Sequence, residues 1–304
     1  MPYKSGECTG CAELFNILDS FLQTSGWERV YSLVDSNNTR YVCIWCSEGD
    51  GHDKIYIQGR LDTKDNSSIV LDGIAGFDKT LEFWEQPGSI QQWNKCDYET
   101  YSNSKIPVLT LVNKEKFYYW IFVNEFRVVV VARLSTVYES CYLGFLKPFA
   151  SERQYAYPMY VAGSGVLNGP KFNENVQGSF VYPSDGSGYL RKSDGNWEEL
   201  SVRYPTVNPQ EIGTLFPYNT NNKDLITNYK EYDAIAQDNF LLFPIFVQLT
   251  DTTGVQGLMY DVYWVSGARD LDAERIFTYN NESYIVFDTK DYRGANTYFC
   301  VKMK

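Results

Sequence analysis

The chain has 304 residues, of which 44% are hydrophobic, so it can bury a sizeable core and is not expected to be disordered. Its formal net charge of −11, with no block of five like charges, argues against binding to nucleic acid or anionic membranes, because phosphate binding needs clustered Lys and Arg. The 25 Tyr, 18 Phe and 7 Trp favour strands and large contact surfaces over helical bundles, so we expect a mainly β protein with protein or sugar partners.

The N-terminal residues 1–7 show no basic stretch followed by an apolar run, and the chain nowhere has 18 uninterrupted apolar residues. We therefore expect a product of the cytoplasm without a membrane span. In that compartment the seven cysteines are expected to be thiols or, at most, metal ligands.

An amphipathic helix is predicted close to the N-terminus, because apolar residues recur there at helical spacing, namely Leu14, Phe15, Ile17, Leu18, Phe21 and Leu22. Thr9 is expected to cap the start of this helix. Gly26 lies where a left-handed residue commonly ends one.

Short strands are predicted after the helix, each ending in turn-forming residues. The first group covers Val30–Val34, Arg40–Cys46, Lys54–Leu61 and Ile106–Val112. The second covers Phe240–Leu249, Gly257–Val265, Arg275–Tyr279, Tyr284–Asp288 and Thr297–Lys302. Between the groups, two long apolar runs flank the polar pair Asn124-Glu125, which predicts a hairpin over 117–133 that is buried on both faces.

The predicted architecture is a β-sandwich or a set of barrel-like sheets with one N-terminal helix, a β-rich fold. Residues 1–162 would hold the helix and the β core, and residues 218–304 would complete that core. The segment 163–217 is rich in Gly, Pro, Asn and Ser, which predicts a loop-rich insertion that carries much of the contact with partner proteins. All three parts could form a single domain.

Two Cys-x-x-Cys pairs, Cys8 with Cys11 and Cys43 with Cys46, have the spacing that zinc knuckles use. Cys43 and Cys46 lie in a predicted strand, however, where residues three apart point to opposite faces. Reduced thiols are therefore favoured over a zinc site.

No catalytic set is predicted. His52 is the single histidine and lies in an acidic, turn-like loop without a nucleophile motif, so a solvated loop residue is favoured. A glycosidase would need two carboxylates at a set separation, which a sequence cannot supply. The acidic residues that lie near aromatic residues are Glu82, Glu85, Glu198, Glu199, Asp261, Asp270 and Asp272. No calcium loop or phosphate loop is complete, so no cofactor is predicted.

Several segments resemble a family of virion structural proteins of tailed bacteriophages. They are Asp53–Arg60, Gly73–Asp78, Trp84–Gly88, Val123–Tyr138, Tyr142–Phe149 with Tyr157–Tyr160, and Tyr263–Gly267. These segments are strand and turn sequences and none is a catalytic signature. The resemblance therefore implies a globular, non-enzymatic part of the virion, assembled in the bacterial host cytoplasm, such as a neck, tail or baseplate accessory. Its implied partners are other virion subunits, with a homo-oligomer or ring in the particle.

A carbohydrate-binding module or glycan-degrading receptor-binding spike is the alternative. In that case exposed aromatic residues would stack on sugar rings, and the candidates are Trp84, Trp93, Trp197 and Trp264. Aromatic residues are equally common in protein interfaces, so composition does not choose between the two functions.

Overall fold

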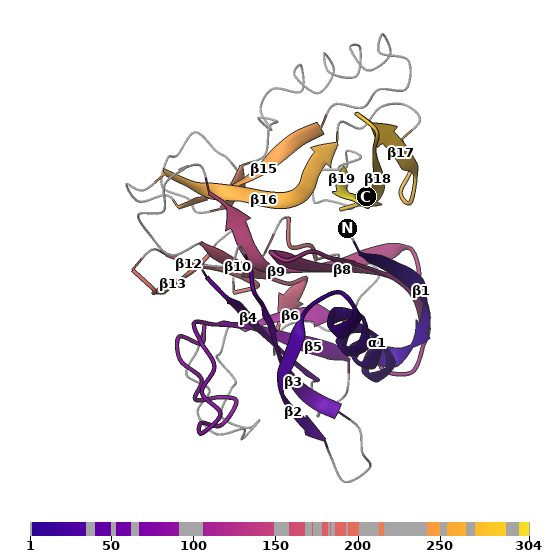
Figure 1. Cartoon of the computed structure of the whole chain (residues 1–304). Coiled ribbons are helices and arrows are strands. Elements are labelled where there is room, and N and C mark those ends of the chain that lie inside the picture. The colour runs from indigo at the N-terminus through magenta and orange to yellow at the C-terminus, as the bar shows by residue number, and fades with distance from the viewer. Residues whose placement is uncertain are drawn as a thin grey trace.

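Figure 1 shows the computed structural model of the whole chain. The residues described below are 2–34, 40–49, 53–61, 67–90, 106–148, 158–167, 172, 178–181, 183, 186–192, 194–200, 213–215, 242–249, 254–265, 271–289 and 298–303.

Two antiparallel sheets make up most of the described structure. The larger sheet follows the path β1 (Tyr3–Thr9), β7 (Lys116–Val123), β8 (Arg127–Leu134), β9 (Val137–Lys147), β16 (Gly254–Val265), β19 (Tyr298–Lys302), β18 (Glu282–Asp288) and β17 (Ile276–Tyr279). Strands off this path are β10 (Met159–Ala162), β12 (Gly188–Arg191), β13 (Trp197–Glu199), β14 (Gly213–Leu215) and β15 (Leu242–Leu249).

The smaller sheet has the order β11 (Gly165–Val166), β6 (Pro107–Thr110), β5 (Ser68–Ile74), β4 (Ile55–Leu61), β3 (Arg40–Ser47) and β2 (Glu28–Val34). The predicted mainly β fold is therefore confirmed, and each strand predicted above is present with ends shifted by a few residues.

The two sheets form three layers, because the larger sheet folds back on itself through β16 (Figure 1). One end of β16 pairs with β9 and the other with β19, and Asp261 between them has a positive φ of 56°. The strands β15 to β19 thus stack on β7 to β10, and the smaller sheet covers the opposite face of those central strands.

Each boundary between layers holds its own core, and the central hairpin contributes to both. Val128 and Val130 pack in the core that faces the smaller sheet and α1. Val129 and Val131 pack in the core that faces β15 to β19. The predicted hairpin with two buried faces is therefore confirmed, with β7 paired to β8 across the turn.

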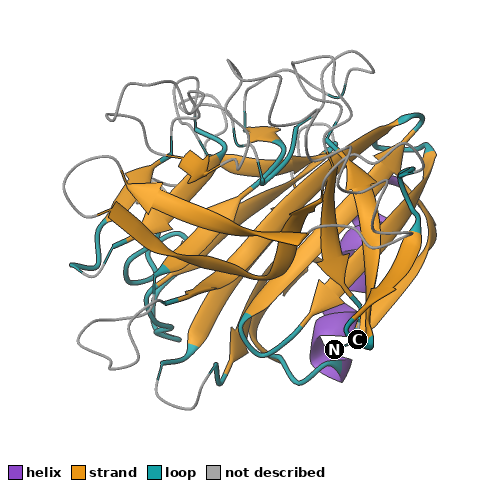
Figure 2. Ribbon diagram, turned by 90° about the horizontal axis from the view of Figure 1, so that it is seen from above, coloured by secondary structure: helices purple, strands orange, loops and turns teal. Residues whose placement is uncertain are grey.

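The helix α1 (Gly10–Thr24) lies beneath one side of the stacked sheets, as Figure 2 shows from above. Its apolar face, which includes Leu14, Phe15, Leu18 and Leu22, is buried in the core next to the smaller sheet. No helix in the described part of the chain is long and apolar enough to cross a membrane.

The prediction was wrong at the N-terminal end of α1 and correct at its C-terminal end. Thr9 occupies the N-cap position, but its side chain makes no capping hydrogen bond, so the expected cap is wrong in its chemistry. Instead the Thr9 N–H donates to the Glu13 carboxylate at 2.7 Å. Gly26 has the expected left-handed conformation, with φ of 94°, and the Trp27 N–H donates to the Leu22 carbonyl at 3.0 Å.

The predicted insertion 163–217 contributes to the core where it is described. β12 pairs with β10 and with β13. Phe180, Leu190 and Leu200 are buried against the central layer. These parts of the segment therefore serve the fold as well as the surface.

Candidate functional site

The four candidate zinc ligands lie in buried positions on three elements. Cys8 is on β1, Cys11 is on α1, and Cys43 and Cys46 are on β3. Cys43 packs in the core beside α1, whereas Cys46 is hydrogen bonded to Tyr56 on the other face of the smaller sheet. The two thiols of the second pair therefore point to opposite faces, as their spacing predicts.

Burial also makes the thiols of Cys8 and Cys46 poor metal ligands. It raises the pKa of the Cys8 thiol to about 12, with Glu13 and Glu7 adding to the shift, and it raises the pKa of Cys46. A metal binds the thiolate, which these surroundings disfavour. Within the described residues, no group of three or more His, Cys, Asp or Glu side chains is arranged to hold a metal ion.

The candidate catalytic residues that are described come from separate elements of the fold. His52 and Asp270 lie outside the described residues. The other acids occupy separate segments: Glu82 and Glu85 follow β5, Glu198 and Glu199 are on β13, Asp261 is on β16, and Asp272 precedes β17.

The described tryptophans of the sugar-binding alternative pack against different hydrophobic clusters. Trp264 is only 1% exposed in the core beneath β15 to β19, so it cannot stack on a sugar ring, and its candidacy was wrong. Trp84 and Trp197 are half-buried and pack on clusters that lie on opposite faces of the smaller sheet. Trp93 lies outside the described residues.

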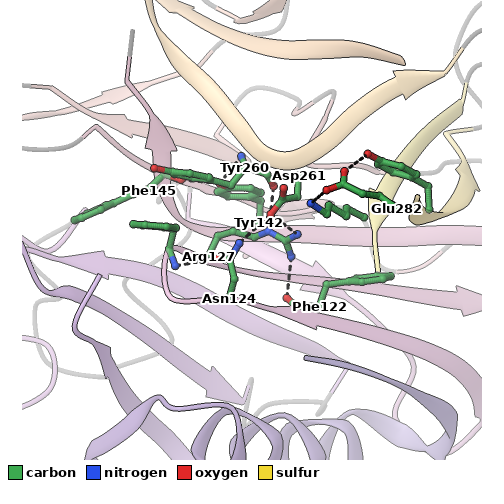
Figure 3. A network of polar contacts seen from close by, with 11 residues as sticks. Phe122, Asn124, Arg127, Tyr142, Phe145, Tyr260, Asp261 and Glu282 are labelled. Atoms are coloured by element: carbon green, nitrogen blue, oxygen red, sulfur yellow. Dashed lines mark hydrogen bonds and ion pairs between the residues drawn. The ribbon is translucent and has the colours of Figure 1, made fainter. Parts of the chain in front are cut away.

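A network of polar contacts surrounds Arg127, at the place where β16 bends over the central layer (Figure 3). The guanidinium of Arg127 is fully buried. Its Nε donates to the Tyr260 carbonyl and its Nη1 to the Phe122 carbonyl, both at 3.1 Å. Its Nη2 lies 3.9 Å from the Asp261 carboxylate, which supplies the counter-charge.

The turn between β7 and β8 completes this network. The Asn124 side-chain oxygen accepts from the backbone N–H groups of Phe126 and Arg127, at 2.9 and 2.8 Å. The Asn124 side-chain nitrogen donates to Asp261 at 3.1 Å. The ring of Phe126 stacks on Tyr260 with centroids 4.4 Å apart.

Arg127 therefore connects the central hairpin to the bend in β16. Burial lowers the pKa of the guanidinium, while the Asp261 carboxylate opposes that shift by favouring the charged form. Its hydrogen bonds hold these strands together. Because the guanidinium has no exposed surface, it is not placed to touch a ligand. The sequence offered one signal for this role: a charged residue directly before the apolar run Val128–Ala132.

Glu139, on β9, is another buried ionisable residue that the sequence did not indicate. Its carboxyl group accepts hydrogen bonds from the Ser164 hydroxyl and the Gly178 N–H, and its Oε2 has no hydrogen-bond partner. Burial raises the pKa of Glu139 to about 8, and the two hydrogen bonds only partly offset it. The Glu139 side chain has a structural role, since its hydrogen bonds connect β9 to the segment around Ser164.

The exposed apolar side chains are the remaining candidate site, and most of them lie at sheet edges. Ile276 is 56% exposed and Tyr279 is 38% exposed, both on β17, the last strand of the larger sheet. Val34 is 49% exposed on β2, the last strand of the smaller sheet. Open strand edges with exposed apolar residues are suited to binding another protein.

Within β17 the apolar character is not interrupted by charge. The strand reads Ile276-Phe-Thr-Tyr279, and its Phe277 is buried against Tyr284 with stacked rings 5.4 Å apart. The sequence predicted this strand but not its place at an edge, because that place depends on pairing with β18 and β19 across the fold.

Comparison of the chain with protein-family models and with curated proteins finds no match in either case.

Proposed function

We propose that this chain is a non-enzymatic structural component of a tailed phage particle, such as a neck, tail or baseplate accessory, and that it acts by docking to other virion subunits. It would be made in the cytoplasm of the bacterial host. The resemblance of segments such as Val123–Tyr138 and Tyr142–Phe149 to virion structural proteins supports a location in the phage particle.

The observation that carries the docking role is the open edge at β17. Its side chains Ile276 and Tyr279 are exposed although they are apolar or aromatic, and the strand has no partner on its outer side in the described structure. An edge of this kind is stabilised when another chain covers it, through both apolar burial and backbone hydrogen bonds.

Charge supports a protein partner for this edge. The chain has a formal net charge of −11, so it repels phosphate-rich surfaces as a whole. β17 itself carries no ionisable group other than the phenol of Tyr279. A neutral, apolar strand of another subunit suits such a surface better than a charged polymer does.

The sugar-binding alternative receives no comparable support. It needs two or three exposed aromatic side chains beside acids in one groove. Trp264 is buried, and Trp84 and Trp197 pack against different hydrophobic clusters.

Quantitative mass spectrometry of purified particles, from the phage that encodes this chain, tests the proposal. We expect the chain at a fixed copy number relative to the major capsid protein, retained through density-gradient purification and a high-salt wash. A chain that is abundant in infected cells but lost from washed particles would contradict the proposed function.

A further inference from the structure

We propose that β17 pairs with β17 of a second copy of this chain, antiparallel and in a two-fold register centred on Phe277. This inference rests on the proposed function, since it names a partner for the docking edge.

The other sheet edges whose side chains are described carry protective features. β1 carries Lys4 and Glu7, and β13 carries Glu198 and Glu199. β2 has register shifts near both of its ends, and β11 has only two residues. Charges, bulges and short length are the means by which proteins prevent edge-to-edge pairing. The four residues of β17 include no charge and no register shift, and the bulge of Glu274 and Arg275 opposite Val286 lies before the strand begins.

The turn after β17 determines which of its backbone groups face outwards. Asn280 and Asn281 both have positive φ, 51° and 64°, as in a two-residue type I′ turn. The flanking pair, Tyr279 with Glu282, is therefore hydrogen bonded within the hairpin. Hydrogen-bonded and non-hydrogen-bonded pairs alternate along antiparallel strands, so the backbone groups of Phe277 also point towards β18. The N–H and C=O groups of Ile276 and Thr278 therefore point towards the open edge.

The two-fold register follows from those outward groups. Two identical antiparallel strands are related by an axis perpendicular to their sheet, so residues that pair must lie on the same face. A centre at Phe277 places Ile276 opposite Thr278 of the second copy, and every outward N–H and C=O of both residues is then paired. A centre at Thr278 would place Ile276 opposite Asn280, a turn residue, and leave the groups of Ile276 without partners.

The side chains are compatible with the same register. Phe277 meets Phe277 of the second copy in a pair without backbone hydrogen bonds, where side chains approach most closely. Ile276 and Thr278 meet on the opposite face, where Ile276 now exposes its side chain. Aromatic and β-branched residues are the types that stabilise cross-strand pairs.

Two acidic chains can approach at this edge without strong repulsion. Glu274, before β17, is paired with Arg133 and accepts a hydrogen bond from Tyr138 at 2.8 Å. Glu282, after the turn, is paired with Lys302. The carboxylates that flank the strand are therefore each neutralised within their own chain.

A contact built on a four-residue strand is small. Interfaces below about 1,200 Å² are typical of transient complexes. We therefore expect a dimer that forms as concentration rises and that becomes lasting when the particle holds both copies together.

The experiment uses two variants of the full chain that each add one cysteine to the seven present, Ile276→Cys and Thr278→Cys, with the parent as the background control. In the proposed register these positions face each other with Cα atoms about 5.5 Å apart, within disulfide range. Under mild oxidation, an equal mixture of the two variants should give several-fold more disulfide-linked dimer than either variant alone. Peptide mass spectrometry should identify the 276–278 linkage.

Each other outcome overturns the inference. Efficient dimers of Thr278→Cys alone would indicate a register centred on Thr278, and those of Ile276→Cys alone a register centred on Ile276. No specific linkage in the mixture, at concentrations up to those of an assembled particle, would mean that the strands do not pair.

Sedimentation equilibrium separates this inference from the proposed function. The weight-average mass of the parent should rise with concentration towards twice that of one chain. Ile276→Lys should abolish the rise and Val34→Lys, on the other exposed edge, should not. A parent that stays monomeric, in a chain that is nevertheless found in particles, would overturn self-pairing and leave the structural role in place.

Discussion

At the scale of single residues, two of the buried ionisable side chains, Arg127 and Glu139, are expected to have opposite consequences for stability. Arg127 is fully buried but hydrogen bonds two carbonyls from different strands and lies near Asp261. Glu139 is buried with one oxygen that has no partner. The first group is expected to stabilise the fold at all ordinary pH values, and the second is expected to make its stability depend on pH.

Replacing Arg127 by Met should lower the free energy of unfolding by several kcal/mol. A hydrogen bond from a charged donor contributes about 1.5–3 kcal/mol, and the bonds from the guanidinium to the Phe122 and Tyr260 carbonyls would both be lost. Urea unfolding followed by tryptophan fluorescence measures the change. The matched control is Arg133→Met, because the half-exposed pair of Arg133 with Glu274 should contribute only about 0–1 kcal/mol. Equal losses in the two variants would contradict the role assigned to Arg127.

Glu139 should make the protein less stable as pH rises. Its pKa is raised from 4.5 to about 8 in the folded state, so between these values the folded chain binds more protons than the unfolded chain does. The contribution is complete below pH 4.5 and is lost as pH rises through about 8, at up to about 1.4 kcal/mol per pH unit.

The variant Glu139→Gln isolates that effect, because the amide oxygen can still accept from Ser164 and Gly178 but does not ionise. Urea unfolding of parent and variant at several pH values from 5 to 8 should show the variant gaining stability relative to the parent as pH rises. A constant difference between the two proteins over this range would show that Glu139 does not titrate there.

At the scale of elements, the central hairpin is the part of the fold that its sequence predicts best. The runs that form β7 and β8 are apolar at successive positions, and that is possible only where both faces of a strand are covered. The two cores on either side of Val128 to Val131 bear this out.

Replacing Val129 or Val131 by Asp should prevent the chain from folding. Both side chains are fully buried, and an unpaired charge there costs several kcal/mol, comparable to a total stability of about 5–15 kcal/mol. The measurement is the yield of soluble protein with a cooperative unfolding transition. Val34→Asp, at an exposed edge position, is the control and should fold like the parent. A folded Val129→Asp protein would mean that the hairpin has a solvated face.

Other strands were harder to predict because polar residues interrupt them. β9 contains Glu139, Ser140 and Gly144, and β5 contains Asp72, yet these residues are buried by contacts from distant segments. The Asp72 carboxylate accepts from the Ser89 hydroxyl and from the Ile90 N–H, at 2.9 and 3.0 Å. A local pattern cannot anticipate such partners, since they are brought together only by the tertiary fold.

For the same reason, only part of the candidate site could be predicted from the sequence. Spacing alone predicted that Cys43 and Cys46 would point apart. It could not predict that Trp264 would be buried, because its burial comes from the layer folded over by β16. Nor could it show that β12, inside the loop-rich segment 163–217, is a core strand, so removing that whole segment would damage the fold as well as the surface.

At the scale of the whole molecule, the apolar strand β17 lies at an open edge of the three stacked layers in the described structure. The interior cores and the Arg127 network account for stability, and β17 is the described surface best suited to a protein partner. Docking through that edge is the central claim of our account, whether the strand it receives belongs to a second copy or to a different subunit.

A complementation assay measures this claim most directly. Phage lacking the gene for this chain are supplied with the parent, with Ile276→Lys or with Val34→Lys, and the amount of chain in purified particles is determined together with infectivity. Lysine is chosen because natural edge strands use it to prevent pairing, and both positions are exposed enough to accept it without unfolding. Our account predicts that Ile276→Lys is depleted from particles several-fold and that Val34→Lys enters at the parental level. Normal incorporation and infectivity of a folded Ile276→Lys variant would contradict it.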